Sequence, residues 1–313
     1  MVSGPIQAQP AVMAKLCAKA LEAGIEVDYV RGLIEKRGLV PEEPPVEIEA
    51  WPWPVKIYTL GRFHVLKEGT PLSFARKVQR KPLALLKAVI ALGERGARED
   101  QLCEALWAEA EGDAAHFALT SAIHRLRRLV GHEAAVIRKN DAVSLDARYC
   151  WVDVWAVERL LGRAEAAAAP RPQDDGPWDE AIRATERAVH LYQGPFLEGE
   201  AESPWAGPLA DRLCRRLLRQ VVKIGLRWEG KQEWQKAADC YATALRVDPC
   251  AEDASRRLMI ACHRLGRASE VEAAYRHCHE ALAARLGVTP SPETQTLLRS
   301  LHASYFPVQN TDD

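Results

Sequence analysis

Residues 113–131 carry the side chains best suited to binding, because they form a predicted helix with one apolar and one basic face. The apolar residues recur at helical spacing and are Leu119, Ile123, Leu126 and Val130. The opposite face holds Ser121, His124 and Arg128, with Thr120, Arg125 and Arg127 at its margins. Such side chains donate hydrogen bonds to phosphates and base edges, as in a DNA-recognition helix. The solvated face of an ordinary surface helix has the same pattern, so the neighbouring elements must decide between the two interpretations.

Motifs for catalysis are missing from the sequence, which has no glycine-rich phosphate loop, nucleophile elbow, dinucleotide fingerprint or HExxH metal motif. The eight cysteines include no Cys-x-x-Cys pair, and several lie among apolar helical residues, as reduced core thiols do. His277-Cys278-His279 and Cys262-His263 contain metal-ligating residue types, but adjacent residues on a helix point in different directions. We therefore expect no enzyme, no metal site and no cofactor.

Composition and charge are those of a folded protein with a basic middle part. The chain of 313 residues is 48% hydrophobic and 27% charged, which predicts two or three packed domains. The net charge is -1, yet residues 55–150 hold 16 Lys and Arg against 11 Asp and Glu, a local charge of +5. This part suits a polyanionic partner. No apolar run reaches the ~18 to 20 residues that span a bilayer, and no signal segment is evident, so we expect a cytoplasmic protein without membrane contact.

The elements around the basic helix predict a winged helix. Apolar residues alternate between Val55 and Phe74, which indicates short antiparallel strands. A helix is expected from Pro82 to Leu92 and a shorter one over residues 98–107. After the basic helix, residues 135–145 form two short apolar strands around a turn at 139–141, so Arg138, Lys139 and Asn140 lie in the predicted wing. In this arrangement the third helix enters the major groove and the wing reaches the adjacent backbone.

The first 50 residues predict two short helices, 12–21 and 27–36, followed by a proline-rich linker and the sequence Trp51-Pro-Trp-Pro54. Two such helices are too small to bury a core by themselves. We expect their packing partners elsewhere in the fold or outside the chain.

The C-terminal half predicts helical repeats. Residues 163–177 are small, polar and proline-rich, and are expected to form a linker or a long loop. Beyond them two patterns recur 36 residues apart, Gly230, Ala237, Ala238 and Tyr241 followed by Gly266, Ala273, Ala274 and Tyr275. This spacing is close to that of tetratricopeptide repeats, although alanine-rich helices can match by coincidence. The aromatic residues Trp234, Tyr241 and Tyr275, with Arg276, either line a concave ligand face or form the inter-repeat core, and we favour the core.

Several short motifs in the same order resemble those of bacterial activators of the SARP type. The motifs IYTLGRF at 57–63, RKPLALL at 80–86, LW at 106–107 and HRLRR at 124–128 resemble the DNA-binding domain of that family. The motifs VD at 152–153, YQGPFL at 192–197, DP at 248–249 and LGVTPSPET at 286–294 resemble the bacterial transcriptional activator domain that follows it. Residues 23–34 and 51–54 further resemble the junction in larger multidomain regulators, which implies that we should expect either the C-terminal part of such a protein or a relative without the sensor.

This resemblance implies an OmpR-like winged helix that binds direct repeats in tandem, with duplex DNA and RNA polymerase as partners and a homodimer on DNA. It places Ser121, His124 and Arg128 toward the groove, although relatives often carry Arg or Ser where this chain has His124. Among the basic residues, Arg125 and Arg128 are assigned to base edges, and Arg127 and Lys139 to phosphates.

We thus predict an α+β winged helix-turn-helix domain followed by an all-α tetratricopeptide-like domain. The expected boundaries are a short helical segment at 1–50, the winged helix at 51–150, the activator domain at 151–306 and a tail at 307–313. The predicted function is sequence-specific transcriptional activation. The alternative is a helical-repeat interaction scaffold or ligand sensor with a winged-helix adaptor.

Overall fold

The computed structural model describes residues 10–39, 41, 43–72, 80–110, 112–169, 178–200 and 203–305. The chain divides into two compact units, Met1–Leu160 with Arg187–Asp211, and Leu161–Glu186 with Arg212–Asp313. Phe74, residues 170–177 of the predicted linker and the predicted tail at 307–313 lie outside the described residues. Each unit is described by itself below, and the domain boundaries given above stay a prediction.

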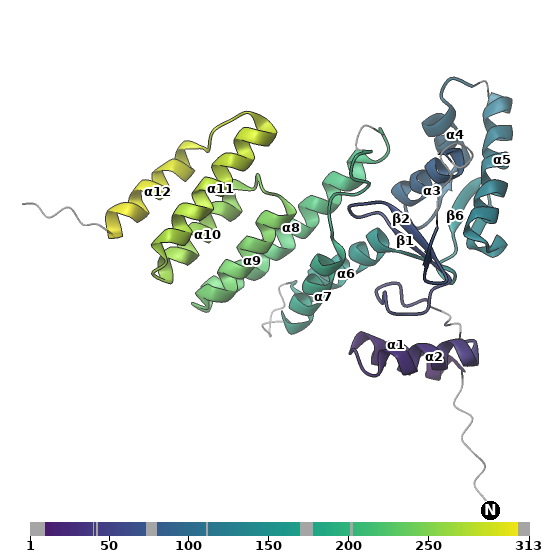
Figure 1. Cartoon of the computed structure of the whole chain (residues 1–313), viewed down its shortest axis with the longest axis horizontal. Coiled ribbons are helices and arrows are strands. Elements are labelled where there is room, and N and C mark those ends of the chain that lie inside the picture. The colour runs from purple at the N-terminus through teal and green to yellow at the C-terminus, as the bar shows by residue number, and fades with distance from the viewer. Residues whose placement is uncertain are drawn as a thin grey trace, which may run out of the picture. The chain divides into compact units, whose positions relative to one another are not determined.

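The first unit contains a four-stranded sheet in the order β3-β2-β1-β7, of which β1 and β2 are labelled in Figure 1. Its strands are β1 (Val55–Tyr58), β2 (His64–Lys67), β3 (Thr70–Pro71) and β7 (Cys150–Val152). The antiparallel pairs β1–β2 and β2–β3 follow from the period-two alternation, and Val55 and Ile57 are fully buried. The parallel pairing of β1 with β7 joins segments about 95 residues apart, Val55 opposite Cys150. Local patterns carry no signal for such a pair, and the sequence did not predict it.

The junction between β7 and helix α6 (Asp153–Ala167) is held by a buried carboxylate. The Oδ2 atom of Asp153 accepts hydrogen bonds from the backbone N–H groups of Thr59 and Leu60 at 2.7 and 2.8 Å, and Oδ1 accepts one from the Thr59 hydroxyl at 2.6 Å. Burial raises the pKa of Asp153 to about 6, although these hydrogen bonds and one from Val154 oppose the shift. The carboxylate thus joins α6 to the end of β1.

Three helices and a second sheet form the winged helix of the first unit (Figure 1). The helices are α3 (Arg80–Leu92), α4 (Glu99–Trp107) and α5 (Gly112–Val130), and all three contact one another. The sheet has the order β4-β6-β5 and consists of β4 (Ala97–Arg98), β5 (Val136–Lys139) and β6 (Ala142–Leu145). A short 3-10 turn, Glu133–Ala135, precedes β5. The predicted winged helix-turn-helix is confirmed.

The predicted N-terminal helices are α1 (Pro10–Glu22) and α2 (Val27–Arg37), and they find their packing partners within the chain. Their buried residues share an apolar cluster with Trp51, Trp53 and Trp151. The indole N–H of Trp53 donates to the carbonyl of Ile48 at 3.0 Å, and that of Trp151 to the carbonyl of Val46 at 2.7 Å. The tryptophans therefore supply the core that the two short helices lack by themselves.

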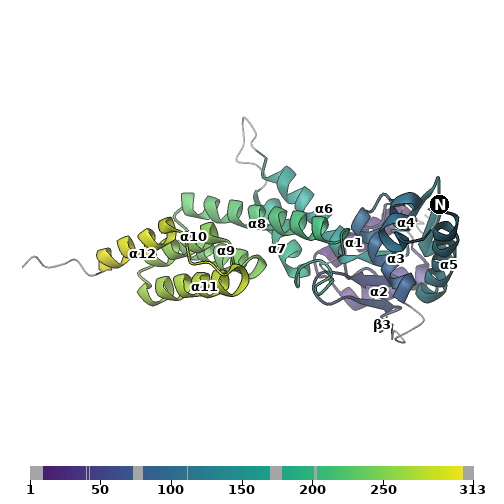
Figure 2. The same cartoon turned by 90° about the horizontal axis from the view of Figure 1, so that it is seen from above.

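The second unit is helical throughout its described residues. Beside parts of α6, α7 (Trp178–Leu191) and α8 (Gly207–Gly230), it contains α9 (Trp234–Val247), α10 (Glu252–Arg264), α11 (Ala268–Leu286) and α12 (Pro292–Tyr305). Helices α9, α10 and α11 lie side by side in both views (Figures 1 and 2), with α10 in the middle. The predicted all-α repeat domain is confirmed. The core interpretation holds for Tyr241, which is fully buried, whereas Trp234 and Tyr275 are half-buried and Arg276 is exposed. Residues 163–167, predicted to be linker or loop, instead continue α6, since alanine is the strongest helix former.

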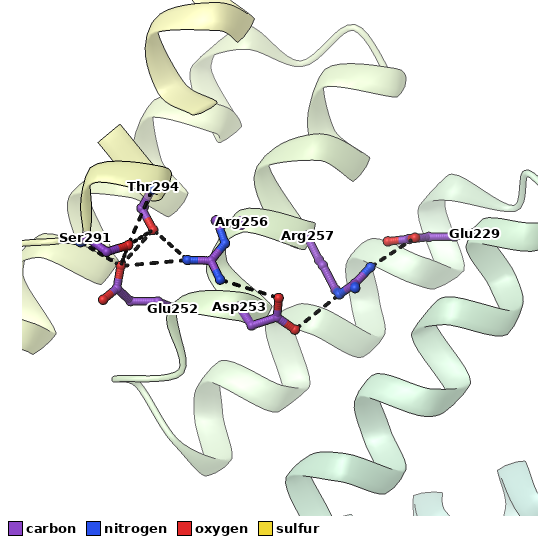
Figure 3. A network of polar contacts seen from close by, with 7 residues as sticks. All are labelled: Glu229, Glu252, Asp253, Arg256, Arg257, Ser291 and Thr294. Carbon is purple, nitrogen blue, oxygen red and sulfur yellow. Dashed lines mark hydrogen bonds and ion pairs between the residues drawn. The ribbon is translucent and has the colours of Figure 1, made fainter. Parts of the chain in front are cut away.

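A polar network fastens α10 to its neighbours (Figure 3). Glu252 Oε2 accepts hydrogen bonds from the backbone N–H and hydroxyl of Ser291 at 2.9 and 2.7 Å and from the Thr294 hydroxyl at 2.7 Å. Burial favours a higher pKa for Glu252, but these hydrogen bonds outweigh it and lower the pKa. On the other side of α10, Arg257 lies 3.4 Å from Glu229 of α8. The network thus links α12 and α8 through α10.

Candidate nucleic-acid interface

Helix α5 presents the predicted basic face to solvent. Leu119, Ile123, Leu126 and Val130 are at most 2% exposed, so the apolar stripe fixes the rotation of the helix on α3 and α4. His124, Arg125 and Arg128 are exposed, whereas Thr120 and Ser121 are half-buried. The helix ends where Gly131 adopts a φ of 77°, a backbone conformation that glycine adopts at low cost. The buried stripe therefore determines which side chains face outward.

The predicted wing is the β5–β6 hairpin. Lys139 pairs with Ala142 across the hairpin, which leaves Asn140 and Asp141 as a two-residue loop. Their φ values of 52° and 54° are those of a type I′ turn, which matches the twist of paired strands and favours Asn and Asp. Lys139 and Asn140 are both exposed at the tip of the hairpin. The turn thus presents the amine of Lys139 and the side-chain amide of Asn140 at the end of the wing.

Arg127 has a partner inside the domain. Its Nε and Nη2 atoms donate hydrogen bonds to the carbonyl oxygen of Val136 at 3.1 and 2.9 Å. Val136 is the first residue of β5, so this contact joins the C-terminal half of α5 to the base of the wing. Two of the five guanidinium N–H donors are used here, and a phosphate contact by the others stays a prediction.

Arg138 also lies within a framework of protein contacts. Its guanidinium donates to both carboxylate oxygens of Glu99, the first residue of α4, and to the Thr120 hydroxyl at 3.1 Å. The Thr120 hydroxyl in turn donates to the carbonyl of His116 at 2.9 Å. The hairpin loop is tied to the same place, because the Glu99 N–H donates to the carbonyl of Asp141 at 2.9 Å. These contacts connect α4, α5 and the wing, and the DNA-binding roles of Arg138 and Thr120 stay predictions.

Glu99 was not among the residues predicted from the sequence to belong to this surface. An acidic residue at the start of a helix is common because it compensates the helix dipole, so nothing in the local pattern singled it out. Its carboxylate is nevertheless almost buried, at 5% exposure, and its partner lies 39 residues further along the chain. Only the folded domain brings the two residues together.

Phe117 was also not among the residues predicted to belong to this surface. A phenylalanine in an amphipathic helix is expected in the core, yet this side chain is 79% exposed. It precedes Ser121 by four residues and His124 by seven, so it lies on the same outward face of α5. Helical spacing from Ser121 and His124 was the signal that could have identified it.

The described residues contain no group of three or more His, Cys, Asp or Glu side chains that could hold a metal ion. Burial raises the pKa of several thiols, that of Cys150 to about 12, so such cysteines stay protonated and inert at neutral pH. Every helix in the described part of the chain is too short or too polar to cross a lipid bilayer. The surface formed by α5 and the wing offers a set of exposed hydrogen-bond donors.

Comparisons with known proteins bear on the family and the fold of this chain. Residues 152–302 match the model of the Bacterial transcriptional activator domain. The chain is 26% identical over 265 residues to the Regulatory protein AfsR of Streptomyces griseus, and the match covers 82% of this chain and 26% of that protein. The chain therefore spans about a quarter of the length of this relative.

A solved structure shares the fold. It is that of Mycobacterium tuberculosis EmbR in complex with a low affinity phosphopeptide, with a TM-score of 0.55 and 22% identity, covering 80% of this chain and 65% of that one. Together the matches agree with the predicted resemblance: residues 152–302 match the Bacterial transcriptional activator domain, the Regulatory protein AfsR is similar in sequence over most of this chain, and EmbR is similar in fold.

Proposed function

We propose that this chain is a transcriptional regulator that binds duplex DNA in a sequence-specific way through α5 and the β5–β6 wing. The observation that carries the proposal is the outward face of α5, where His124, Arg125 and Arg128 are exposed beside a wing with exposed Lys139 and Asn140. The local charge of +5 over residues 55–150 supports an anionic partner. In such domains the third helix lies in the major groove and the wing contacts the neighbouring backbone or minor groove.

The contacts within the domain support a division of roles among the basic residues. Arg125 and Arg128 are exposed on the helix and are assigned to base edges, because arginine can bind guanine through two hydrogen bonds. Lys139 at the wing tip is assigned to a phosphate. Arg127 and Arg138 position the wing against α5 and α4, and their remaining donors reach phosphates. Recognition of the groove then depends on α5, and the orientation of the wing depends on the contacts of Arg127 and Arg138.

We further propose that the protein activates transcription by binding direct repeats as a homodimer and contacting RNA polymerase, in the cytoplasm and without catalysis of its own. The match of residues 152–302 to the Bacterial transcriptional activator domain supports an activating role. Binding to direct repeats would place two copies on one face of the duplex if the repeats are spaced by about one helical turn, roughly 10 base pairs.

The test is selection of genomic fragments by the purified chain, followed by footprinting of the bound sites. The proposal expects protected direct repeats at a constant spacing, and a transcription assay with RNA polymerase in which these sites raise promoter output. Fragments bound without any shared sequence would overturn sequence-specific recognition. Bound repeats that leave transcription unchanged would overturn the activating role alone.

A second candidate function is favoured by one feature of the helical unit. A pocket of about 330 Å³ between α9, α10 and α11 is lined by apolar Leu245 and Leu258 and by the polar groups of Arg246, Glu270 and His277. Pockets of this size with a few polar groups bind small molecules or peptide side chains. A scaffold or sensor function would be supported if a ligand raised the melting temperature of the chain while genomic DNA gave no mobility shift.

A further inference from the structure

The side chain of Phe117 is far more exposed than the fold requires. It is 79% exposed, whereas Ile137, the other strongly exposed large apolar residue described between residues 51 and 150, is 37% exposed. The apolar stripe of α5 already packs on α3 and α4 without it. Exposing an aromatic ring of this size forgoes on the order of 1.5–3 kcal/mol of burial free energy. The domain core therefore does not explain this residue.

The position of Phe117 on α5 is that of a groove-facing residue. Ser121, His124 and Arg128 follow at intervals of four, seven and eleven residues, which are whole turns of a helix. Leu119 and Ile123, which are buried, lie on the other side. Phe117 is in the N-terminal half of α5, and a recognition helix lies in the major groove, where its outward side chains can contact base edges.

The chemistry of the major groove offers one apolar group to such a ring. Each base pair presents hydrogen-bond donors and acceptors there, and thymine adds the C5-methyl group, which phenylalanine contacts in known interfaces. A phenyl ring has no donor for a phosphate. The exposed side chains that share its surface, His124, Arg125 and Arg128, favour a polyanion over an apolar protein surface, because docking an apolar partner here would strip water from two guanidinium groups.

We propose that Phe117 reads a thymine by packing its ring against the C5-methyl group in the major groove, at a base position distinct from those that Arg125 and Arg128 contact. This inference rests on the proposed DNA-binding function. It adds a specificity-determining residue that contributes no hydrogen bond, so its effect is confined to one base position. Neighbouring positions are read by the polar side chains of the same face.

The experiment replaces single thymines in a bound site by deoxyuridine, which lacks only the methyl group. The full chain first selects a site from a random duplex library, and its dissociation constant is then measured on duplexes with one thymine replaced at a time. At one position the wild-type chain should bind about fourfold more weakly, the effect of one buried methyl group. Phe117→Ala should bind the thymine and uracil duplexes with equal affinity. Phe117→Leu should keep part of the difference.

Tyr29→Ala is the matched control, because Tyr29 on α2 is an aromatic residue with 71% exposure. It should retain the wild-type preference for thymine, and both alanine variants should keep the wild-type melting temperature, since surface substitutions change stability by less than about 0.5 kcal/mol. These results would separate an effect on recognition from an effect on folding.

Three outcomes would overturn the proposal. A wild-type chain that selects a site but binds every uracil duplex as tightly as the thymine duplex would show that Phe117 reads no methyl group, while DNA binding stands. An unchanged uracil penalty in Phe117→Ala would assign the methyl contact to another residue. A loss of dimers in Phe117→Ala by size-exclusion chromatography, with the thymine preference kept, would assign the ring to contact between copies. Failure of the wild-type chain to select any site would instead reject the proposed function itself.

Discussion

The guanidinium group of Arg138 lies against the carboxylate of Glu99, with Nε–Oε1 and Nη2–Oε2 distances of 2.5 and 2.6 Å. This two-bond pair joins the wing to the start of α4, and the hydrogen bond with Arg138 lowers the pKa of Glu99 and raises that of the guanidinium. Glu99 is only 5% exposed, and Arg138 is its nearest basic partner, with His116 Nδ1 as a further neighbour 3.8 Å from Oε2. The wing is therefore held in place by a partly buried ion pair.

Replacing Arg138 should destabilise the winged helix. Arg138→Ala leaves the nearly buried Glu99 carboxylate without its partner, so we expect the free energy of unfolding to fall by about 1–3 kcal/mol in urea titrations. Lys139 is the neighbouring wing residue and has an exposed side chain, so Lys139→Ala should change the free energy of unfolding by less than about 0.5 kcal/mol. Equal stabilities of the two variants would contradict the positioning role of Arg138.

Replacing Arg128 should weaken specific binding far more than binding to random duplex. A bidentate base contact discriminates by ~1–3 kcal/mol, so Arg128→Ala should raise the dissociation constant on a selected site by roughly ten- to a hundredfold. Arg276→Ala, which removes an exposed arginine from α11, makes the same change in net charge and should bind as the wild type does. A loss of the same size on both DNAs would leave Arg128 as a phosphate contact.

Salt should separate the phosphate contacts from the base contacts. We expect the affinity to fall steeply between low and moderate salt, because the +5 charge over residues 55–150 displaces counterions from DNA. Lys139→Ala should lower the slope of log K against log salt by about 0.9, the value for one phosphate contact. A flat salt dependence of the wild-type chain would argue against a phosphate-based interface.

Asp153 should make the stability of the first unit depend on pH. Its folded-state pKa of about 6 lies above the ordinary value of 3.8, so the folded state binds the proton more tightly than the unfolded chain. The stabilisation is complete below pH 3.8 and is lost as the pH rises to about 6, by an amount on the order of 3 kcal/mol. Asp153→Asn should lack this pH-dependent component, although it should be less stable overall because one amide oxygen cannot accept every hydrogen bond of the carboxylate. Identical pH profiles in urea titrations would refute this role.

Gly225 on α8 should be intolerant of a side chain. A Cβ atom at this position would lie 2.6 Å from Cε1 of Tyr241, whose fully buried ring is held by a 2.7 Å hydrogen bond to Glu229. Gly225→Ala should therefore lower the free energy of unfolding by about 1–3 kcal/mol. Gly162→Ala is the matched control on α6, where a Cβ atom meets nothing within 4 Å, and should raise the stability by about 0.5–1 kcal/mol. Thermal unfolding of both variants checks the contrast.

Local patterns in the sequence determined the elements of this protein. The repeat of apolar residues in α5 predicted both the helix and its outward face, because helical geometry alone places residues three and four apart on one side. The wing turn was predicted by Asn140 and Asp141, whose residue types tolerate the positive φ values that they adopt. The order of these elements, with the motifs of the activator domain, was sufficient for the fold class.

Tertiary structure alone decided which partners these elements have. It assigned Trp51, Trp53 and Trp151 as the core of the N-terminal helices, and it paired Arg138 with Glu99. It also left Phe117 in solvent, although residue type alone would place it in the core. These outcomes depend on contacts between residues far apart in the sequence, such as Glu99 with Arg138 and Val46 with Trp151, or on the space already filled by other side chains. The periodicity of apolar residues describes one segment at a time. It carries no information on contacts between distant segments or on how other side chains fill the space.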